Sequence, residues 1–583
     1  MPTLEWIGKN KVINHHQEVP FRVLERQYSY DEQGQHEEDN GSENMIIRGD
    51  NLEALKALLP RYEGRVKCIY IDPPYNTGNE GWVYNDNVND PKIKKWLGEV
   101  VGKEGEDLTR HDKWLCMMYP RLKLLQKLLA EDGVIFISID DTEYANLKLI
   151  CDEIFGSNCF VSNISWQRTY STRNDSKGIV NEVEHLLVYS KQPNWSPNKL
   201  PRTAEMDSIY KNPDNDEKPW ASDNPFAPGA TTHQGMVYAI QHPFTGKMIY
   251  PTNGRCWTFE QVQMLEFMRG WGNYELRELD DTHERAVVCG VEDAGVRQGV
   301  QAIVLSEPIE TAAVKARMIY ERGKWPKFYF TKNGLGGIRR KTYLENVGGK
   351  LPTNFWPFSE TGHTDEAKKE MLAIFDGKAT FDTPKPRRLL EFVLKVAGSE
   401  DALILDSFAG SGTTAHAVLN MNKADGGHRK FILVEMMDYA DSITAERVKR
   451  VIQGYGEGKN AVEGTGGNFS FYDLGEPLLV GDCLNEAVAP EKIREYIWFM
   501  ETKTSYAPLS SGNPYYLGQH NSTGYYFYYE PQRVTVLDYA FLATIKEKAD
   551  GTVIYADRCS IGEDKLAQMG IAFKKIPRDI SRL

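Results

Sequence analysis

The sequence Ile69-Tyr70-Ile71-Asp72-Pro73-Pro74-Tyr75-Asn76-Thr77-Gly78 joins an apolar run to a stiff, polar exit. The apolar run begins at Cys68 and ends at Ile71, and its length and β-branched residues predict a buried strand. The two prolines fix φ and donate no backbone N–H, so the chain leaves this strand stiffly with carbonyl groups available. Ligands bind at the carboxyl ends of the strands in open α/β sheets. We therefore predict an α/β fold with a ligand site that begins at Asp72.

The four residues after the strand, Asp72, Pro73, Pro74 and Tyr75, suit a flat ligand with an exocyclic amino group. The Asp72 carboxylate and the Pro73 carbonyl can each accept one hydrogen of an –NH2 group, while the Tyr75 ring stacks on the ligand. Taken alone, this sequence is also typical of a proline-rich strand exit in which the aspartate only caps the chain. A second motif, far along the chain, decides between these interpretations.

The second motif is a strand, a glycine loop and a helix start, Leu403 to Leu419, with the loop Asp406-Ser407-Phe408-Ala409-Gly410-Ser411-Gly412-Thr413-Thr414. The glycines allow a tight turn close to a ligand, and a helix N-terminus favours polar or anionic groups. About twenty residues later a second strand ends in Glu435, a spacing that suits a carboxylate on ribose hydroxyls. Gly410-x-Gly412-x-x-Ala415 would also serve a nucleotide-cofactor oxidoreductase, but that alternative leaves Asp72 to Tyr75 unexplained.

Together the two motifs resemble those of amino-group DNA methyltransferases that use S-adenosylmethionine. The catalytic motif precedes the cofactor motif, which is the permuted order of the β class. The sequence is most similar to the modification (Mod) subunit of type III restriction–modification systems. The stretches that carry this resemblance are Arg48 to Glu53, Tyr70 to Gly78, Phe136 to Asp141, Phe381 to Pro386 and Leu405 to Val418. The resemblance implies a Rossmann-like methyltransferase core with a mostly parallel sheet, an inserted mixed α+β target-recognition domain and a small C-terminal α/β domain.

The resemblance also implies the site residues. The catalytic candidates are Asp72, Pro73, Pro74 and Tyr75, and the cofactor candidates are Asp50, Lys385, Asp406, Phe408, Ala409, Gly410, Gly412, Thr413, Thr414 and Glu435. Asp50 is expected at the adenine end of S-adenosylmethionine and Lys385 near its methionine carboxylate. Alternatively, Asp50 is a helix cap and the Lys385 segment only a helix start. Eight scattered cysteines without a CxxC pair indicate reduced thiols and no metal site.

Changes in composition predict the order of the domains. The predicted segments are an N-terminal arm (1–43), the catalytic half of the core (44–157), the target-recognition domain (158–377), the cofactor half (378–453), a glycine-rich linker (454–467) and a C-terminal domain (468–583) with a subunit-contact role. The polar segment from Asn76 to Arg110 is typical of a mobile loop over the site. Arginines in the insert, Arg168 among them, are available for base edges.

The net charge of −13 argues against a protein that coats nucleic acid nonspecifically. One segment, Thr311 to Lys350, is nevertheless basic, with ten lysines and arginines against two glutamates, and aromatic residues lie among them. This pattern predicts a phosphate track with stacking platforms, although a lysine-rich surface of a β-rich domain is the alternative. The DNA-contact candidates are Arg322, Lys324, Lys327, Arg339, Arg340 and Lys341.

The predicted reaction is methylation of adenine N6 in double-stranded DNA. Hydrogen bonds to Asp72 and the Pro73 carbonyl would push the nitrogen lone pair out of the ring plane, and the base would first leave the duplex. An aspartate in the first motif position favours adenine by family habit. A cytosine N4 or RNA methyltransferase, an orphan methyltransferase and a non-catalytic recognition scaffold are the alternatives.

The remaining expectations concern partners and location. Since the chain has no GxxxxGK[ST] pattern, a restriction partner would be a separate helicase–nuclease (Res) subunit. The resemblance implies a homodimer. No apolar run has the length of a membrane span, so a cytoplasmic protein without membrane contact is expected.

Overall fold

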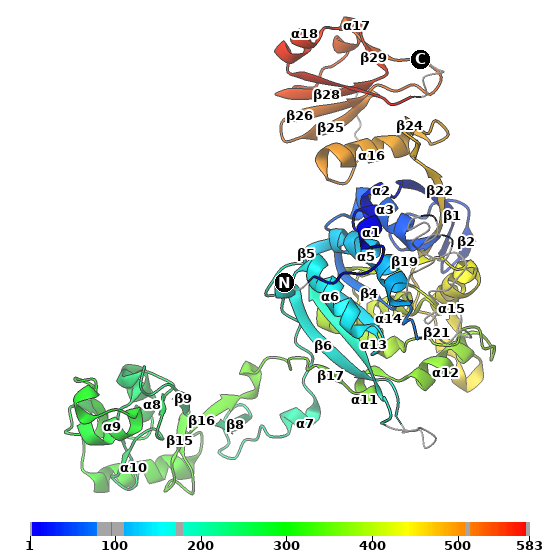
Figure 1. The fold of residues 1–583 in the computed structure, drawn as a ribbon. Helices are drawn as coiled ribbons and strands as arrows, with labels where there is room; N and C mark the ends of the chain where they lie inside the picture. Colours follow the sequence, from blue (N-terminus) through cyan, green and yellow to red (C-terminus); the bar gives the residue numbers. More distant parts are fainter. Residues whose placement is uncertain are drawn as a thin grey trace. The chain divides into compact units, whose positions relative to one another are not determined.

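The computed structural model describes residues 3–77, 110–170, 179–507 and 513–578, together with Lys95 and Glu99 (Figure 1). The chain forms two compact units, of which unit 1 comprises Met1–Asn198 and Pro352–Leu583 and unit 2 comprises Lys199–Leu351. Most of the predicted loop between Asn76 and Arg110 lies outside the described residues.

Unit 1 is built on a sheet of eleven strands in the order β17-β6-β7-β5-β4-β18-β19-β3-β22-β1-β2 among the described residues. The six strands from β5 to β22 in this order run parallel to one another, while β7 and β1 are antiparallel to their neighbours. This mostly parallel sheet confirms the predicted α/β core. The strands are β1 (Arg22–Asp31), β2 (Gly34–His36), β3 (Met45–Arg48), β4 (Val66–Ile71), β5 (Leu129–Ile139), β6 (Phe160–Gln167), β7 (Val183–Ser190), β17 (Phe355–Trp356), β18 (Leu403–Asp406), β19 (Lys430–Glu435) and β22 (Phe469–Pro477).

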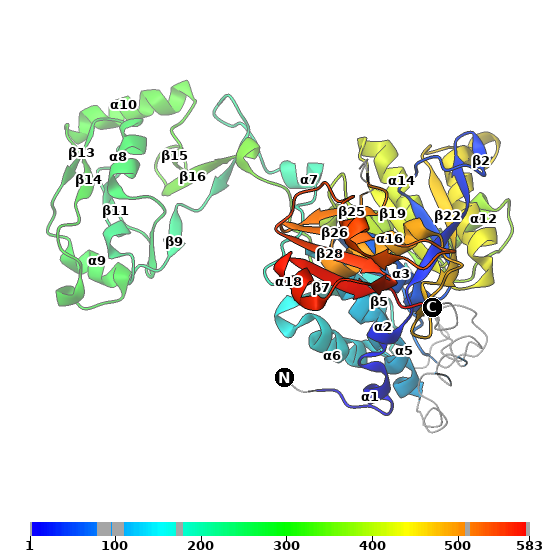
Figure 2. The same cartoon turned by 90° about the horizontal axis from the view of Figure 1, so that it is seen from above.

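Helices cover both faces of the sheet, because its central strands are apolar on both sides (Figure 2). Ile69 and Ile71 of β4 share one core cluster with α3, α5 and α6. Successive side chains of a strand alternate, so Cys68 and Tyr70 face the other layer, which contains α13 and α14. The helices of unit 1 up to the end of the cofactor half are α1 (Lys9–Val12), α2 (His15–Glu18), α3 (Asn51–Tyr62), α5 (Arg110–Leu128), α6 (Tyr144–Phe155), α11 (Phe358–Thr361), α12 (Thr364–Ile374), α13 (Arg387–Ala397), α14 (Thr413–Asp425) and α15 (Glu446–Gln453).

The strand register brings the two sequence motifs to one edge of the sheet. Ile69 of β4 lies beside Leu405 of β18, and Asp406 of β18 lies beside Leu433 of β19. Because these strands are parallel, their carboxyl ends lie together, and Asp72, Asp406 and Glu435 follow or end them. Motifs that are far apart in the sequence therefore meet at neighbouring strand ends.

The N-terminal residues are part of the core and do not form the predicted arm. Strand β1 pairs with β22, and the hydroxyls of Ser29 and Ser470 hydrogen-bond at 2.8 Å. Trp6 Nε1 donates to Cys116 Sγ on α5 at 3.3 Å. The predicted arm was wrong because β1 lies next to the last strand of the sheet and has polar residues on its solvent-facing side. Its composition therefore resembles that of a loosely packed segment.

The second unit is smaller than the predicted 158–377 insert. Strands β6 and β7 extend the main sheet, and β17 pairs with β6, so the compact unit begins at Lys199 and ends at Leu351. The alternation of helices and strands does fade at residue 158, but β6 and β7 join the main sheet by antiparallel pairing and β17 pairs parallel with β6.

Unit 2 has a mixed α+β fold around an aromatic core in which Trp257, Trp271, Phe328 and Phe330 are fully buried. Its larger sheets have the orders β11-β10-β14-β13 and β15-β16-β8. Its elements are α7 (Ala204–Asp207), β8 (Trp220–Asp223), β9 (Phe226–Pro228), β10 (Ile240–Gln241), β11 (Met248–Ile249), β12 (Arg255–Trp257), α8 (Gln261–Arg269), β13 (Tyr274–Arg277), α9 (Thr282–Cys289), β14 (Ala302–Leu305), α10 (Ile309–Arg322), β15 (Phe328–Phe330) and β16 (Ile338–Tyr343).

The C-terminal part, for which the sequence predicted a small α/β domain from residue 468, first contributes β22 to the main sheet and then forms a smaller sheet with helices. The glycine-rich segment before it contains a hairpin, β20 (Gly454–Tyr455) with β21 (Val462–Glu463). Helix α16 (Pro490–Thr502) meets α3 through the ion pair of Arg61 with Glu495. A four-stranded sheet follows, made of β25 (Tyr516–His520), β26 (Thr523–Phe527), β28 (Gly551–Ala556) and β30 (Ile571–Lys575), with helices α17 (Tyr539–Leu542) and α18 (Glu563–Gln568). Within the described chain, no helix combines the length and apolarity needed to span a membrane.

Candidate active site

A buried cluster of polar side chains follows the end of β4. Asp72 and Tyr75 are 7% and 5% exposed, and the Tyr75 hydroxyl donates to Asp72 Oδ1 at 2.8 Å. Lys385 Nζ donates to Oδ1 and Oδ2 of Asp72 at 2.8 and 2.9 Å and to the Tyr75 hydroxyl at 2.8 Å. The structure thus brings Lys385 to the catalytic candidates, whereas the sequence placed it near the cofactor carboxylate.

The two proline carbonyls differ in their hydrogen bonding. The indole Nε1 of Trp114, on α5, donates to the Pro74 carbonyl at 2.6 Å. Among the described residues no donor reaches the Pro73 carbonyl. Pro73 therefore offers the acceptor that the sequence assigned to it, beside the Asp72 carboxylate.

A second carboxylate in this cluster, Glu184, comes from β7 and was not predicted. Its Oε2 accepts from the Tyr75 hydroxyl at 3.3 Å and lies 3.4 Å from Lys385 Nζ. Its Oε1 accepts from Arg168 Nη1 at 2.9 Å. One signal was available, since a charged residue inside the apolar run Val183–Ser190 needs a buried partner. We name Asp72, Tyr75, Glu184, Lys385 and Arg168 the carboxylate cluster.

Burial and charge together set the protonation of this cluster. Burial lowers the pKa of Lys385, but the charges of Asp72 and Glu184 outweigh burial and raise it above its usual range. Burial raises the pKa of Glu184, and the charges of Lys385 and Arg168 overcome that effect and lower it. Burial, followed by the nearby carboxylates, raises the pKa of Tyr75 far above its usual range. At neutral pH the cluster therefore contains charged Lys385, ionised Glu184 and a neutral phenol.

The glycine loop after β18 is held by two buried carboxylates. Asp406 accepts from the Phe408 backbone N–H at 3.1 Å and from the Thr414 hydroxyl at 2.6 Å. Glu435 Oε2 accepts from the Gly410 backbone N–H at 2.8 Å. Burial raises the pKa of Asp406 to about 7. The remaining cofactor candidates of this loop, Ala409, Gly412 and Thr413, are buried with it.

The loop conformation requires glycine at Gly412. Its φ is +79°, and a Cβ there would lie 2.9 Å from the Thr444 carbonyl oxygen. Helix α14 begins directly afterwards, so its N-terminal N–H groups point toward the loop. Within the described chain the Ser407 hydroxyl is buried and has no hydrogen-bond partner. An orphaned hydroxyl beside a helix N-terminus and two carboxylates fits a polar cofactor such as S-adenosylmethionine.

Asp50 has the capping role that was its alternative interpretation. It caps α3 by accepting from the Leu52 backbone N–H at 2.8 Å, and its other oxygen lies 3.3 Å from Arg121 Nη2. The neighbouring Asn51 Nδ2 donates to the Ser407 carbonyl at 3.2 Å, so the cap lies beside the glycine loop. A contact of Asp50 with the cofactor stays a prediction.

A buried arginine on α15, Arg447, supports the same loop and was not predicted. Its Nη1 donates to the hydroxyls of Ser411 at 3.0 Å and Thr413 at 2.7 Å. Its Nη2 donates to Glu370 Oε2 at 3.1 Å, and Glu370 Oε1 accepts from Arg387 Nε at 2.9 Å. This chain of contacts links the glycine loop to the residue two positions after Lys385.

In unit 2 the structure corrects part of the predicted phosphate track. Lys341 is fully buried and pairs with Asp214 and Asp216 at 2.5 and 2.6 Å, so it cannot contact DNA in this fold. Arg340 pairs with Asp223. The aromatic residues Phe328 to Phe330 lie in the core and are no stacking platforms. The mistake arose because a run of basic residues does not reveal which of them meet acids from β8 and its preceding loop.

The other four candidates keep at least part of their surface. Arg322, Lys324 and Arg339 are exposed, and Lys324 lies 3.3 Å from Glu217. Lys327 is partly buried over the rings of Phe259 and Phe267. Within the described chain Arg322 and Arg339 form no ion pair, so they remain the best-placed phosphate contacts of the six.

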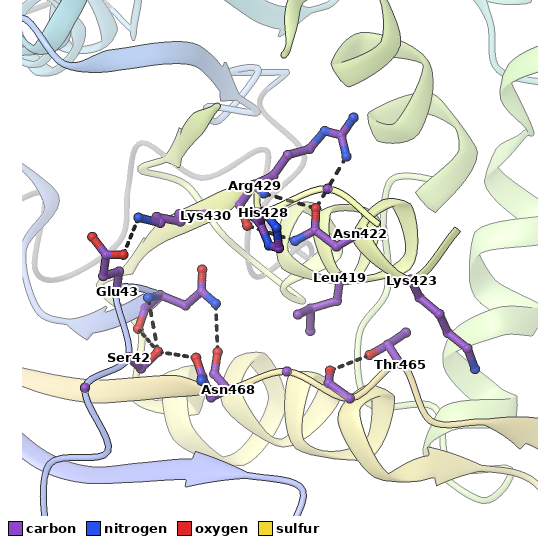
Figure 3. Close-up of a pocket in the computed structure, with 15 residues that line it drawn as sticks. Ser42, Glu43, Leu419, Asn422, Lys423, His428, Arg429, Lys430, Thr465 and Asn468 are labelled. Carbon is purple, nitrogen blue, oxygen red and sulfur yellow. Dashed lines mark hydrogen bonds and ion pairs between the residues drawn. The ribbon is translucent and has the colours of Figure 1, made fainter. Parts of the chain in front are cut away.

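A surface pocket of about 400 Å³ lies at the opposite ends of the strands, where Asn44 precedes β3, Lys430 begins β19 and Asn468 precedes β22. Figure 3 shows Lys430 and Glu43 pointing toward one another, and Lys423 and Arg429 pair with Glu463 and Asp425. No predicted site residue is among the described residues that line it. The site residues predicted from the sequence at the carboxyl edge of the sheet therefore lie outside this pocket.

Comparison with known proteins agrees with the resemblance that the Asp72–Tyr75 motif and the glycine loop suggested. The family model N6_N4_Mtase, described as "DNA methylase", matches residues 66–446. The StyLTI Mod subunit of Salmonella typhimurium, a type III restriction-modification enzyme, is 33% identical over 440 residues, which cover 71% of this chain and 58% of that protein. The EcoP15I Mod subunit of Escherichia coli is 29% identical over 479 residues, 78% of this chain and 66% of that protein. M.KpnI of Klebsiella pneumoniae, a type II methyltransferase, is 29% identical over 404 residues, 68% of this chain and 81% of that protein. The chain thus spans about three fifths of the length of the StyLTI subunit.

Proposed function

The chain belongs to the N6/N4 family of S-adenosylmethionine-dependent DNA methylases, and we propose that it is a site-specific adenine N6-methyltransferase. We further propose that it is the modification and recognition subunit of a type III-like restriction–modification system. One observation carries the proposal: the buried Asp72 carboxylate and the available Pro73 carbonyl lie next to each other in the chain. They follow β4 directly, and β4 neighbours β18, the strand that leads into the glycine loop. The names of the Mod relatives support the system.

The residues of the chain would act by positioning and electrostatics. Bound S-adenosylmethionine supplies an electrophilic methyl group. Asp72 and the Pro73 carbonyl would accept the two hydrogens of the target amino group, which concentrates its lone pair on nitrogen and aims it outward. Tyr75 would stack on the flipped base, and Asp72 would accept the proton that the methylated nitrogen must lose.

The cofactor would lie across the carboxyl ends of β18 and β19. Glu435 would bind the ribose hydroxyls, because its carboxylate already lies against Gly410 of the loop. Phe408 to Gly412 would line the cofactor, and the Ser407 hydroxyl would gain a partner. Asp50 would contact the adenine end.

Unit 2 would recognise the DNA sequence, with Arg322 and Arg339 on phosphates. We propose a homodimer that works on double-stranded DNA in the bacterial cytoplasm, with a separate helicase–nuclease (Res) subunit as its restriction partner. The support is the resemblance to type III Mod subunits.

Single-molecule sequencing of DNA from cells that express this chain alone tests the function. We expect N6-methyladenine at one short motif on one strand. A cytosine mark would overturn the choice of base, and unmarked DNA combined with methylated cellular RNA would overturn the choice of substrate.

A further inference from the structure

Lys385 donates to both oxygens of Asp72, one of the two acceptors that the proposed reaction needs. A carboxylate oxygen has two lone pairs, and Asp72 Oδ1 already accepts from both Tyr75 and Lys385. Lys385 also donates to Oδ2. These contacts take three of the four lone-pair positions of the carboxylate, so the target amino group competes with the Lys385 ammonium for Asp72.

A lysine that leaves Asp72 needs another partner, because its side chain is only 9% exposed and an unpaired buried charge is costly. Glu184 offers that partner. Its Oε2 is 3.4 Å from Lys385 Nζ, longer than a full charge-assisted hydrogen bond of about 2.7–2.9 Å. A movement of less than about 1 Å would complete this bond.

Glu184 is also held in place for this role. Arg168 Nη1 binds its Oε1 at 2.9 Å, which leaves Oε2 turned toward Lys385 and Tyr75. The Glu184 side chain is 8% exposed, so water does not compensate for a lost partner. The two ion pairs of Lys385 are thus unequal, with the closer one on the carboxylate that the substrate requires.

We propose that Glu184 is a positioning residue, which receives the Lys385 ammonium when the amino group of the target base binds Asp72. Lys385 closes the Asp72 site while no base is present. The exchange keeps one cation between two carboxylates throughout, so no buried charge is left alone. This inference rests on the proposed function, since it assumes that Asp72 binds an exocyclic amino group.

The first test is a double-mutant cycle on methyl transfer, using the full chain and a duplex with the motif found by sequencing. In Glu184→Gln, Lys385 has no second carboxylate and stays on Asp72, so kcat/KM should fall by about tenfold or more, the size typical of coupled buried partners. Glu184→Gln combined with Lys385→Met removes one charge of each sign and should recover most of that loss. Simple addition of the two single effects would overturn the proposal.

The second test isolates the competition for Asp72. Duplexes with adenine, or with purine lacking the 6-amino group, at the target position are compared for affinity. Lys385→Met should tighten binding of the adenine duplex by about tenfold and leave the purine duplex unchanged. Equal changes for both duplexes, or a loss of S-adenosylmethionine affinity larger than any change in DNA affinity, would show that Lys385 serves another ligand.

Controls separate this inference from folding and from the proposed function. Lys9, 8% exposed and 3.0 Å from Glu153, is a matched buried lysine, and Lys9→Met should change thermal stability without changing the preference for adenine over purine. A rescue in the double variant that is confined to thermal stability would mean that Glu184 only balances charge. If Asp72→Asn remains active, the proposed function itself fails. If Asp72→Asn is inactive but the effects of Glu184→Gln and Lys385→Met simply add, only the transfer of Lys385 from Asp72 to Glu184 is refuted.

Discussion

Each unit of this protein contains a buried lysine between two carboxylates, and the two sites differ in how complete they are. In unit 2, Lys341 lies within 2.6 Å of both Asp214 and Asp216, and Asp214 also accepts from Trp220 Nε1 and the Trp325 backbone N–H. In unit 1, Lys385 is close to Asp72 but 3.4 Å from Glu184.

The difference between these sites is informative about their roles. Both oxygens of Asp214 accept from groups of its own unit, and both ion pairs of Lys341 are short. The carboxylate cluster lies at the carboxyl edge of a parallel sheet, beside an available carbonyl, and its second ion pair is incomplete. A buried lysine with two short ion pairs supports the fold, whereas one with unequal ion pairs at the ligand edge of a sheet is ready to exchange partners.

The largest predicted effect is a loss of methyl transfer when Asp72, the aspartate beside Lys385, is changed. Asp72→Asn replaces one acceptor oxygen by an NH2 group and should reduce methyl transfer by about 10²- to 10³-fold or more, because an electrostatic group at the reacting atom is lost. Cofactor affinity, measured by calorimetry, should stay near the wild-type value. Unchanged turnover of methyl groups into DNA would remove Asp72 from the catalytic residues.

The next effect should appear in the other unit. Lys341→Met leaves the buried Asp214 and the partly exposed Asp216 without their cation and should destabilise unit 2 by about 3–5 kcal/mol. Limited proteolysis should then cut between residues 199 and 351 while S-adenosylmethionine still binds unit 1. A stable variant with lost DNA affinity would restore the predicted contact of Lys341 with DNA.

A third prediction concerns a buried carboxylate that uses backbone donors. Glu435→Ala should weaken S-adenosylmethionine binding by about ten- to a hundredfold, from lost ribose contacts and a loosened Gly410 loop. Isothermal titration measures this. Wild-type affinity would show that Glu435 only braces the loop.

A fourth prediction uses pH to compare carboxylates with and without cations. The charges of Lys385 and Arg168 lower the pKa of Glu184. In the described part of the chain Asp406 accepts only from hydroxyl and amide donors, and burial raises its pKa to about 7. The pKa of Asp406 is about 7 in the folded protein and about 3.8 in the unfolded chain. Between these two pH values the folded protein keeps a proton on Asp406 that the unfolded chain has lost. Its contribution to stability is therefore present at low pH and declines as pH rises from about 4 to 7. Asp406→Asn should remove this part of the pH dependence in thermal unfolding; identical pH profiles would contradict the raised pKa.

The smallest effect distinguishes exposed from buried cations in unit 2. Arg339→Ala should weaken DNA binding severalfold and reduce the slope of log affinity against log salt by about one unit, as expected for one lost phosphate contact. Arg340→Ala, which also breaks the pair with Asp223, is the comparison. An unchanged salt slope in Arg339→Ala would place the phosphate track elsewhere.

The sequence predicted what short stretches of chain determine. The strand before Asp72, the glycine loop and the acid at Glu435 are each encoded locally, and parallel pairing brings them together. Glu184 and Arg447 were missed because only tertiary structure brings them to the site, one from an antiparallel strand and one from a later helix. Lys341 was misassigned for the same reason, since its acidic partners lie more than a hundred residues earlier.

The position of β22 in the sheet has a consequence for how the chain is made. Strand β1 leaves the ribosome well before β22, because the bond between Ser29 and Ser470 spans 441 residues. At about 5–20 residues per second, β1 waits roughly 20 to 90 s for its partner. During that interval the edge of β1 that will meet β22 is unpaired, and the charged residues Glu25, Arg26 and Asp31 discourage its pairing with other nascent chains. The main sheet of unit 1 is therefore completed only after the strands and loops of both motifs have emerged.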